Sequence, residues 1–338
     1  MEANSIFLSV IIPTTNPNRL FFLEEALNSL KEQDLGSHLF EVVVVTNYDL
    51  VLNNSYNFKL TIIKTDKINL GAKLVIGKEN SISNILLFLE DDDTFHPKKL
   101  LTVYTLFEKH NTLSYFKNGL NLISNTGENI YVPAFKNVEK NLYFQPNLDF
   151  FSNTSLPDIE KLYAVLSSIT IKKNLIERIS MCLSKVNFNS DLALLLSALD
   201  FNSVIMTDSA KLTNYRIHNG GSRTFEPDMR QFTTKTINFL KDEIDTSQEL
   251  FGCLKNERTI GLLHEIMVKQ ELELLRWQSI DFRAFMQALT KYLKITKLKR
   301  YNLRFIIITI LFYCFPKKMR NLYKHNIQEG FYAMSIDK

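Results

Sequence analysis

Short apolar runs bounded by turn residues predict a parallel βαβ unit near the start of the chain. Residues 7–12 and 40–45 are apolar and rich in β-branched side chains, which is typical of buried strands. Between these runs, leucines recur at helical spacing: Leu20, Leu23, Leu27 and Leu30. Two strands that are apolar throughout, joined by a helix, indicate parallel pairing and a crossover connection.

The same pattern continues along the chain and then changes to helices. Further strands are predicted at 60–64 and 85–89, a helix at 72–83, and another helix that opens at Pro97. Asn125-Thr126-Gly127 interrupts the stretch 113–133 and predicts a hairpin of short strands there. The pattern is helical around 159–161 and 191–199, and largely helical after about residue 226.

Polar residues stand where three of the predicted strands end: Pro13-Thr14, Thr46-Asn47 and the acidic run Glu90 to Asp93. Ligands of open parallel sheets bind beyond the carboxyl ends of the strands, so we expect these residues to converge on one crevice. Closely spaced carboxylates can hold Mg²⁺ or Mn²⁺. The alternative is a solvated acidic loop that caps the helix near Pro97. Crowded like charges are costly unless a cation or a raised pKa relieves them.

Four motifs occur in the order and spacing typical of a known family. They are Ser9 to Leu20 (SVIIPTTNPNRL), Ala26 to Gln33 (ALNSLKEQ), Leu89 to Asp93 (LEDDD) and Tyr215 to Ser222 (YRIHNGGS). Over residues 6 to 225 the chain resembles a family 2 glycosyltransferase, which implies the nucleotide-sugar-binding GT-A fold. Motifs of other nucleotide enzymes do not occur: there is no Walker loop and no Gly-x-Gly-x-x-Gly after the first strand.

The resemblance implies a role for each matched position. Nucleotide and donor binding would fall to Pro13, Thr14, Arg19, Asn47, Asn80, Asp91, Arg216, Ser222 and Arg223. The divalent ion, Mn²⁺ or Mg²⁺, would be held by Asp92, Asp93 and His218. The family places an acid where this chain has Asn47, so the choice of nucleotide is left open.

An inverting transferase needs a general base that takes the proton of the acceptor hydroxyl. The family places this base in a Glu-Asp pair at the start of a helix, and the matching residues here are Ser190 and Asp191. The resemblance therefore makes Asp191 the candidate catalytic base, with Asp158 as the second choice. The alternative is that Asp191 only stabilises the first turn of its helix through the helix dipole.

Composition and charge add two expectations. Only three cysteines occur among 338 residues, far apart and without a C-x-x-C pair, which predicts neither a disulfide scaffold nor a thiolate zinc site and favours a reducing compartment. Ten Lys and Arg and no acid lie between Lys291 and Lys324, so the rest of the chain carries −6 within a total of +4. One end of the protein is therefore expected to meet an anionic partner.

Within the basic segment 291–324 lies the apolar run Phe305 to Phe315. A helix of that length spans about 16 Å, roughly half of a bilayer core, so it suits shallow insertion into an anionic membrane surface. The alternative is a helix buried in the core or in a homodimer. Nucleic acid is a weaker candidate, because no nucleic-acid-binding module accompanies the segment.

The sequence thus predicts an α/β, Rossmann-like, mostly parallel GT-A sheet at 1–225, followed by a helical region at 226–338. The resemblance implies a metal-dependent inverting glycosyltransferase of hexosyltransferase type, with a nucleotide-diphosphate sugar (UDP-sugar favoured) as donor and a glycan or lipid-linked acceptor. The expected setting is polysaccharide or lipopolysaccharide assembly in the cytoplasm, at the inner face of the membrane. The alternatives are a non-catalytic sugar-binding or scaffold subunit and a nucleotidyltransferase, which usually has a Gly-rich phosphate loop near its first strand.

Overall fold

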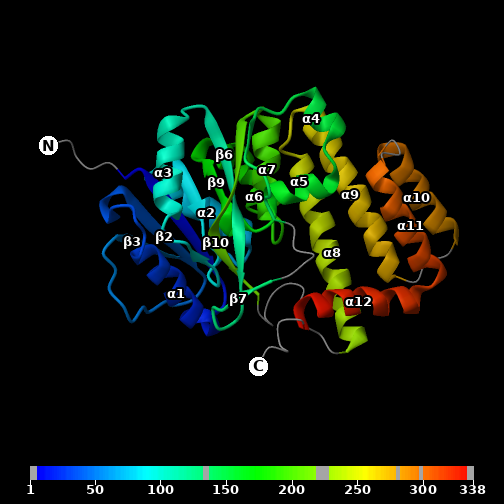
Figure 1. The fold of residues 1–338 in the computed structure, drawn as a ribbon, viewed down its shortest axis with the longest axis horizontal. Coiled ribbons are helices and arrows are strands. Elements are labelled where there is room, and N and C mark those ends of the chain that lie inside the picture. Colours follow the sequence, from blue (N-terminus) through cyan, green and yellow to red (C-terminus); the bar gives the residue numbers. More distant parts are fainter. Residues whose placement is uncertain (1–5, 132–136, 218–227, 279–281, 297–299, 333–338) are drawn as a thin grey trace.

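The computed structural model describes residues 6–131, 137–217, 228–278, 282–296 and 300–332 (Figure 1). Its strands are β1 (Leu8–Thr14), β2 (Phe40–Thr46), β3 (Lys59–Lys64), β4 (Ile85–Phe88), β5 (Thr94–Phe95), β6 (Leu113–Ile123), β7 (Asn129–Ile130), β8 (Leu142–Phe144), β9 (Ile169–Lys172) and β10 (Val204–Arg216). Its α-helices are α1 (Leu20–Lys31), α2 (Leu70–Glu79), α3 (Lys99–Lys109), α4 (Leu148–Asn153), α5 (Leu156–Tyr163), α6 (Lys173–Leu183), α7 (Ser190–Asp200), α8 (Met229–Phe251), α9 (Glu257–Trp277), α10 (Phe282–Thr296), α11 (Arg300–Cys314) and α12 (Pro316–Tyr332).

One ten-stranded sheet forms the centre of the N-terminal region, in the order β3-β2-β1-β4-β9-β6-β10-β5, with β7 beside β6 and β8 beside β10. The first four strands pair in parallel, as the sequence predicts. Beyond β4 the sheet becomes mixed, because β9 pairs antiparallel with both β4 and β6. The parallel strands β1, β2 and β4 end at the same edge, which brings their terminal residues together.

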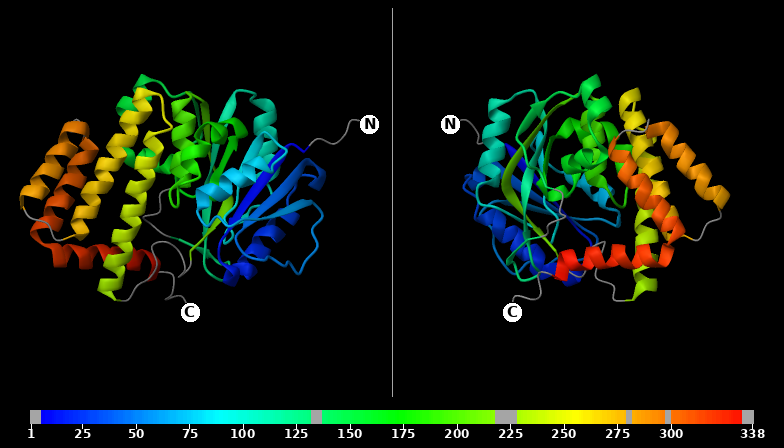
Figure 2. Two further views of the ribbon diagram at one scale, coloured as in Figure 1. Left: turned by 180° about the vertical axis from the view of Figure 1, so that it is seen from behind. Right: turned by 45° about the vertical axis from the view of Figure 1, so that its right-hand side comes forward.

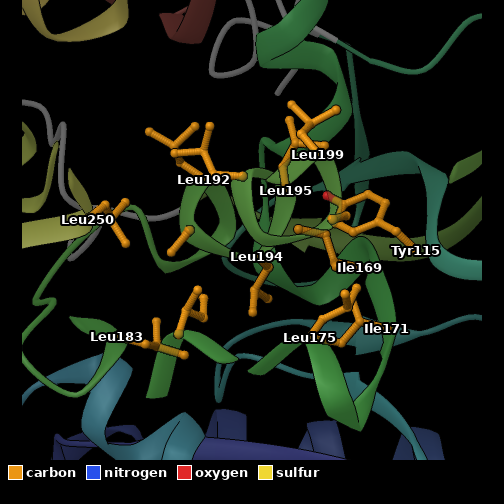
Figure 3. Close-up of a cluster of buried hydrophobic side chains, with 14 of the residues drawn as sticks. Tyr115, Ile169, Ile171, Leu175, Leu183, Leu192, Leu194, Leu195, Leu199 and Leu250 are labelled. Carbon is orange, nitrogen blue, oxygen red and sulfur yellow. The ribbon is translucent and has the colours of Figure 1, made fainter. Parts of the chain in front are cut away.

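Helices cover both faces of the sheet, and the side chains of each strand alternate between the two cores. Val10 and Ile12 of β1 pack with the leucines of α1, whereas Ile11 packs on the other side with Leu74 of α2. Helix α7 is buried on every side. In Figure 3 its Leu192, Leu194 and Leu199 project in different directions into surrounding apolar side chains.

The C-terminal region is helical, as predicted, and its first helices share the core of the sheet. Leu250 at the end of α8 and Leu263 of α9 belong to the same apolar cluster as the leucines of α7. Helices α10 and α11 pack on the outer side of α9 and form the end of the molecule farthest from β3 (Figure 1). Among the described residues, no helix is both long and apolar enough to cross a membrane.

The cysteine prediction was wrong in one respect. Cys182 at the end of α6 and Cys253 after α8 are joined by a disulfide, with a sequence separation of 71 residues. The spacing of these cysteines along the chain does not predict the disulfide. The two residues meet because α8 packs against α6. Cys314 is an exposed free thiol.

Candidate active site

The ends of β1, β2 and β4 meet as the sequence predicts, and hydrogen bonds join them. Thr14 Oγ1 donates to Asp91 Oδ2 at 2.6 Å and lies 3.1 Å from the hydroxyl of Tyr48. Lys73 of α2, fully buried, donates to the Thr14 carbonyl and, at 2.7 Å, to Asn47 Oδ1. Pro13 precedes Thr14 in the buried part of β1. Thr14, Asn47 and Asp91, which were predicted to bind the nucleotide-sugar, therefore lie together at the carboxyl ends of the strands and form the floor of the candidate site.

Arg19 ties the start of α1 to the acidic loop. Its Nη1 atom lies 3.2 Å from Asp91 Oδ1 and 2.9 Å from Asp92 Oδ2. The side chain of Asp91 is nearly covered, at 7% exposure, whereas that of Asp92 retains 15%. Asp92 is thus the more accessible of the two acids that Arg19 holds.

Asp93 is directed into the protein. It is fully buried, with Oδ2 accepting the Ser167 hydroxyl at 2.6 Å and Oδ1 accepting the Arg216 backbone N–H at 2.9 Å. An approaching cation would reach Asp93 only through lone pairs that these two bonds leave over. Asp93 therefore stabilises the loop from the protein interior, whereas the carboxylate of Asp92 is partly accessible to solvent.

Arg216, predicted to bind the donor, is engaged in contacts within the protein. Its guanidinium is buried under the loop and donates to the carbonyls of Asp92, Ser124 and Asn125, and it pairs with Glu25 Oε2 at 2.6 Å. These partners occupy the hydrogen-bond donor groups of the side chain, which is only 2% exposed. Arg216 is consequently an anchor that links β10, α1 and the acidic loop.

The acidic loop is electrostatically crowded. Burial, and next the neighbouring Asp93, raise the pKa of Glu90 well above its usual value, and burial also raises the pKa values of Asp91 and Asp93. Arg19 and the Thr14 hydroxyl act in the opposite direction on Asp91. Hard carboxylate oxygens that repel one another fit a divalent cation, which would relieve the repulsion. Within the described ranges, however, no group of three His, Cys, Asp or Glu side chains is arranged to hold a metal ion by itself.

The structure also brings Asp191 close enough to the acidic loop to interact electrostatically with Glu90. Asp191 lies in the first turn of α7, where its Oδ1 atom accepts the Leu192 N–H at 2.9 Å. Burial raises the pKa of Asp191 to about 6, while the Leu192 N–H and the Lys117 ammonium oppose that rise. A carboxylate with a pKa near neutrality is well matched to general-base work.

Lys117 supports this corner from within the sheet. Its buried ammonium donates to the Ala164 carbonyl and the Ser168 hydroxyl, which flank Val165. Val165 has φ +73°, a costly conformation for a β-branched residue. The next turn carries Ser167, which donates to Asp93 and accepts the Glu90 N–H at 2.9 Å. Lys117 thus holds the turn that positions two acids of the loop.

Two other candidates make local contacts in their own helices. Asn80, predicted to bind the donor, ends α2 with its amide donating to the Ile76 carbonyl at 2.9 Å. The next residues, including Ser83, bond to the beginning of β1, at the opposite edge of the sheet. Asp158 is exposed in the first turn of α5 and pairs with Lys161. Asn80 therefore lies at the edge of the sheet opposite the acidic loop, and Asp158 is engaged at the start of α5.

His218, Ser222 and Arg223 lie outside the described residues, so their predicted roles remain predictions. Sequence reasoning missed Lys73, Lys117 and Ser167. Lys73 carries a usable signal, because it is the one charged residue in the otherwise apolar or small stretch from Leu70 to Gly77. A lysine there must be buried with the helix face, and a buried ammonium needs specific acceptors. Ser167 has no comparable signal.

Comparison with known proteins shows similarity to glycosyltransferases. Residues 9–168 match the model of the family described as glycosyl transferase family 2. An uncharacterized glycosyltransferase of Haemophilus influenzae is 34% identical over 113 residues, which cover 32% of this chain and 37% of that protein. Staphylococcus aureus poly(ribitol-phosphate) β-N-acetylglucosaminyltransferase TarS is 29% identical over 112 residues, 31% of this chain and 19% of that protein. The matched stretches thus span well under half of either relative.

Solved structures extend the likeness over nearly the whole chain. The crystal structure of S. aureus TarS 1-349 in complex with UDP-GlcNAc superimposes with a TM-score of 0.55 at 16% identity, covering 97% of this chain and 92% of that one. The mannosyltransferase PcManGT from Pyrobaculum calidifontis, in complex with GDP-Man and Mn²⁺, gives 0.54 at 13% identity, covering 98% and 87%. At these identities the likeness establishes the fold, a GT-A sheet with a helical C-terminal region. The match to the model of glycosyl transferase family 2 spans β1, the acidic loop and the turn at Ser167, so the similarity of this chain to that family covers the part of the sheet that forms the site.

Proposed function

We propose that this protein is a metal-dependent, inverting glycosyltransferase that moves a sugar from a nucleotide-diphosphate sugar to an acceptor hydroxyl. The observation that carries the proposal is the joining of Asp91 and Asp92, held by Arg19, with Asp191 at the carboxyl edge of the sheet. This arrangement offers an anionic cation site and a separate base with a pKa of about 6. Both are what a direct displacement at a sugar carbon requires.

The residues divide the work by position. The nucleoside would lie on the floor made by Thr14, Asn47 and Tyr48, which Lys73 holds from beneath. Asp92 would bind Mn²⁺ or Mg²⁺ on the accessible side of the acidic loop, and Asp93 would hold the loop in place from the protein interior. The bound ion would offset charge on the departing diphosphate.

Asp191 would accept the proton of the acceptor hydroxyl while the oxygen of that hydroxyl bonds to the anomeric carbon. The bond from that carbon to the diphosphate oxygen then breaks, and the nucleoside diphosphate leaves with the electron pair. The support for this role is that Asp191, in the first turn of α7, interacts electrostatically with Glu90 of the loop that would hold the diphosphate. One displacement of this kind inverts the anomeric configuration.

A UDP-sugar is the proposed donor, and a glycan or lipid-linked hydroxyl is the proposed acceptor. The support is the fold shared with TarS, whose structure contains UDP-GlcNAc, and with PcManGT, whose structure contains GDP-Man and Mn²⁺. The proposed setting is the assembly of a polysaccharide, lipopolysaccharide or other glycan. Asn47 leaves the base open, because its amide offers both a donor and an acceptor.

The test is a thermal-shift panel of UDP, GDP, CDP and dTDP, each with and without Mn²⁺, on wild type and Asp92→Ala. We expect one nucleotide to raise the melting temperature only when Mn²⁺ and Asp92 are both present. The exposed acid Asp66 on the loop after β3 supplies the control, since Asp66→Ala should retain the shift. No shift with any nucleotide would exclude the metal-dependent donor site. A shift without donor hydrolysis or transfer would instead indicate a sugar-binding subunit.

A further inference from the structure

Helix α11 carries an apolar stripe that the protein leaves uncovered. Leu303, Ile307, Ile310 and Leu311 are between 37% and 52% exposed, and Phe315 follows at the end of the helix with 57%. Their spacing of three and four residues places them along one side of the helix. Single exposed apolar residues are ordinary, but a continuous row of large ones marks a contact surface.

Packing within the protein does not account for the stripe. The opposite side of α11 already supplies the buried contacts, with Ile306, Thr309 and Phe312 facing the neighbouring helices and the Thr309 hydroxyl bonded to Arg276. Beyond Arg304, helix α11 therefore carries large apolar side chains on both its covered and its uncovered side. The neighbouring helix α10 adds exposed Phe282 and Met286.

The surroundings of the stripe are basic. Between Asp281 and Glu329 the chain has eleven Lys and Arg and no acid. Arg304 stands within the stripe's sequence, and Lys317 and Lys318 follow Phe315; all three are exposed. In the described part of the chain, no acidic side chain pairs with any of these three, whereas Lys291 of α10 pairs with Glu271 at 2.6 Å. The segment therefore presents uncompensated positive charge.

Charge and shape together select the partner. In a twofold dimer through α11 the same basic segment would face itself, and like charges would oppose the contact. An anionic lipid surface, by contrast, accepts apolar side chains and attracts lysines and arginines at once. Helix α11 has 15 residues, so it is about 22 Å long and lies within a membrane surface more readily than it crosses one.

The place of α11 allows such a contact. Together with α10 it forms the end of the molecule remote from β3 (Figures 1 and 2). We propose that the outer side of α11, flanked by Arg304, Lys317 and Lys318, inserts shallowly into an anionic membrane leaflet. This inference stands on the helical region alone and is independent of the proposed transfer reaction.

Vesicle flotation tests the proposal with the full chain. Wild type should float with vesicles of phosphatidylglycerol and phosphatidylcholine, not with phosphatidylcholine alone, and added salt should release it. Ile307→Glu should lower the partition into vesicles about tenfold, since it removes apolar area and adds a charge of the repelled sign. Lys317→Gln and Lys318→Gln should each lower it about fivefold.

The matched control is Ile82→Glu, because Ile82 is a similarly exposed isoleucine between α2 and β4. It should float like wild type. Circular dichroism and sedimentation velocity on each variant separate lipid binding from misfolding and self-association. Equal flotation of wild type and a folded Ile307→Glu would overturn the proposal. A wild-type dimer that ignores vesicles and that Ile307→Glu converts to a monomer would overturn it in favour of a dimer surface.

Discussion

Asp191 carries the proton transfer in the proposed reaction, and its surroundings set the pH at which it can act. Burial raises its pKa to about 6, so the carboxylate is largely protonated below that pH. We expect the turnover number to fall about tenfold per pH unit below 6 and to level off above it. Asp191→Asn should lose about 10²–10⁴-fold in rate and lose this limb of the profile. A wild-type rate in the variant would exclude Asp191 as the base.

The same carboxylate should cost stability at neutral pH. Its pKa is raised in the folded protein, so the folded state binds the proton more tightly than the unfolded state. This contribution stabilises the fold at low pH and is lost as the pH rises through about 6. Asp191→Asn should therefore have a higher free energy of unfolding than wild type at pH 7, and the difference should shrink below pH 5.

Arg216 should matter for stability more than for donor affinity. Arg216→Met would leave Glu25 without its buried partner and several carbonyls without donors, at a cost of about 3–5 kcal/mol in the free energy of unfolding. Chemical denaturation measures this. The control is Arg178→Met, whose exposed guanidinium stacks on Phe201 and should cost about 1 kcal/mol or less. Unchanged stability with lost nucleotide binding would instead support the predicted role of Arg216 in donor binding.

At the scale of single residues, the sequence predicts where a side chain lies better than it predicts which groups that side chain bonds. Thr14, Asn47 and the acidic loop converge as expected because strand ends fix where side chains emerge. The contacts of Arg216 and Asn80 could not be predicted, because a motif shows that a residue occurs and not what its side chain bonds. The acceptors of Arg216 lie between 91 positions away along the chain, at Asn125, and 191 positions away, at Glu25 in α1.

Helix α2 shows how closely the elements of the site are packed. A Cβ on Gly71 would lie 1.9 Å from the Leu183 carbonyl oxygen, and a Cβ on Gly77 would lie 2.4 Å from Ile11. Gly71→Ala should therefore displace α2, and with it Lys73, and should lower the melting temperature. Gly261 in α9 has open space around it, so Gly261→Ala should raise the free energy of unfolding by about 0.5–1 kcal/mol. Two equal effects in thermal unfolding would contradict this packing.

Elements with one simple period were predicted well, and composite ones were not. The four parallel strands and α1 follow directly from their apolar patterns. The stretch predicted as short strands contains β6, which runs unbroken over 11 residues, with the hairpin signal falling only at its end before β7. Strands β9 and β10 were missed; β9 has only four residues, and the pairing of β9 between β4 and β6 is a long-range choice.

The disulfide joins the helical region to the sheet region. Closing a loop with a sequence separation of 71 residues lowers the entropy of the unfolded chain, which corresponds to about 4 kcal/mol of stabilisation. A reductant, or the variant Cys182→Ser, should therefore lower the melting temperature substantially. Cys314→Ser, at the exposed free thiol, should leave it unchanged. Equal melting of oxidised and reduced wild type would contradict this role.

The sequence by itself determined the parallel half of the sheet, the edge at which the acids gather and the basic, apolar character of the end of the chain. These follow from local periodicity and composition, which a single segment expresses on its own. Only the tertiary structure decided that Asp93 and Arg216 face inward, that Lys73 and Lys117 lie buried under the site, and that Cys182 meets Cys253. It also decided which side of α11 is covered. Each of these depends on contacts between segments far apart in the chain, and such contacts exist only once the helices and the sheet have packed together.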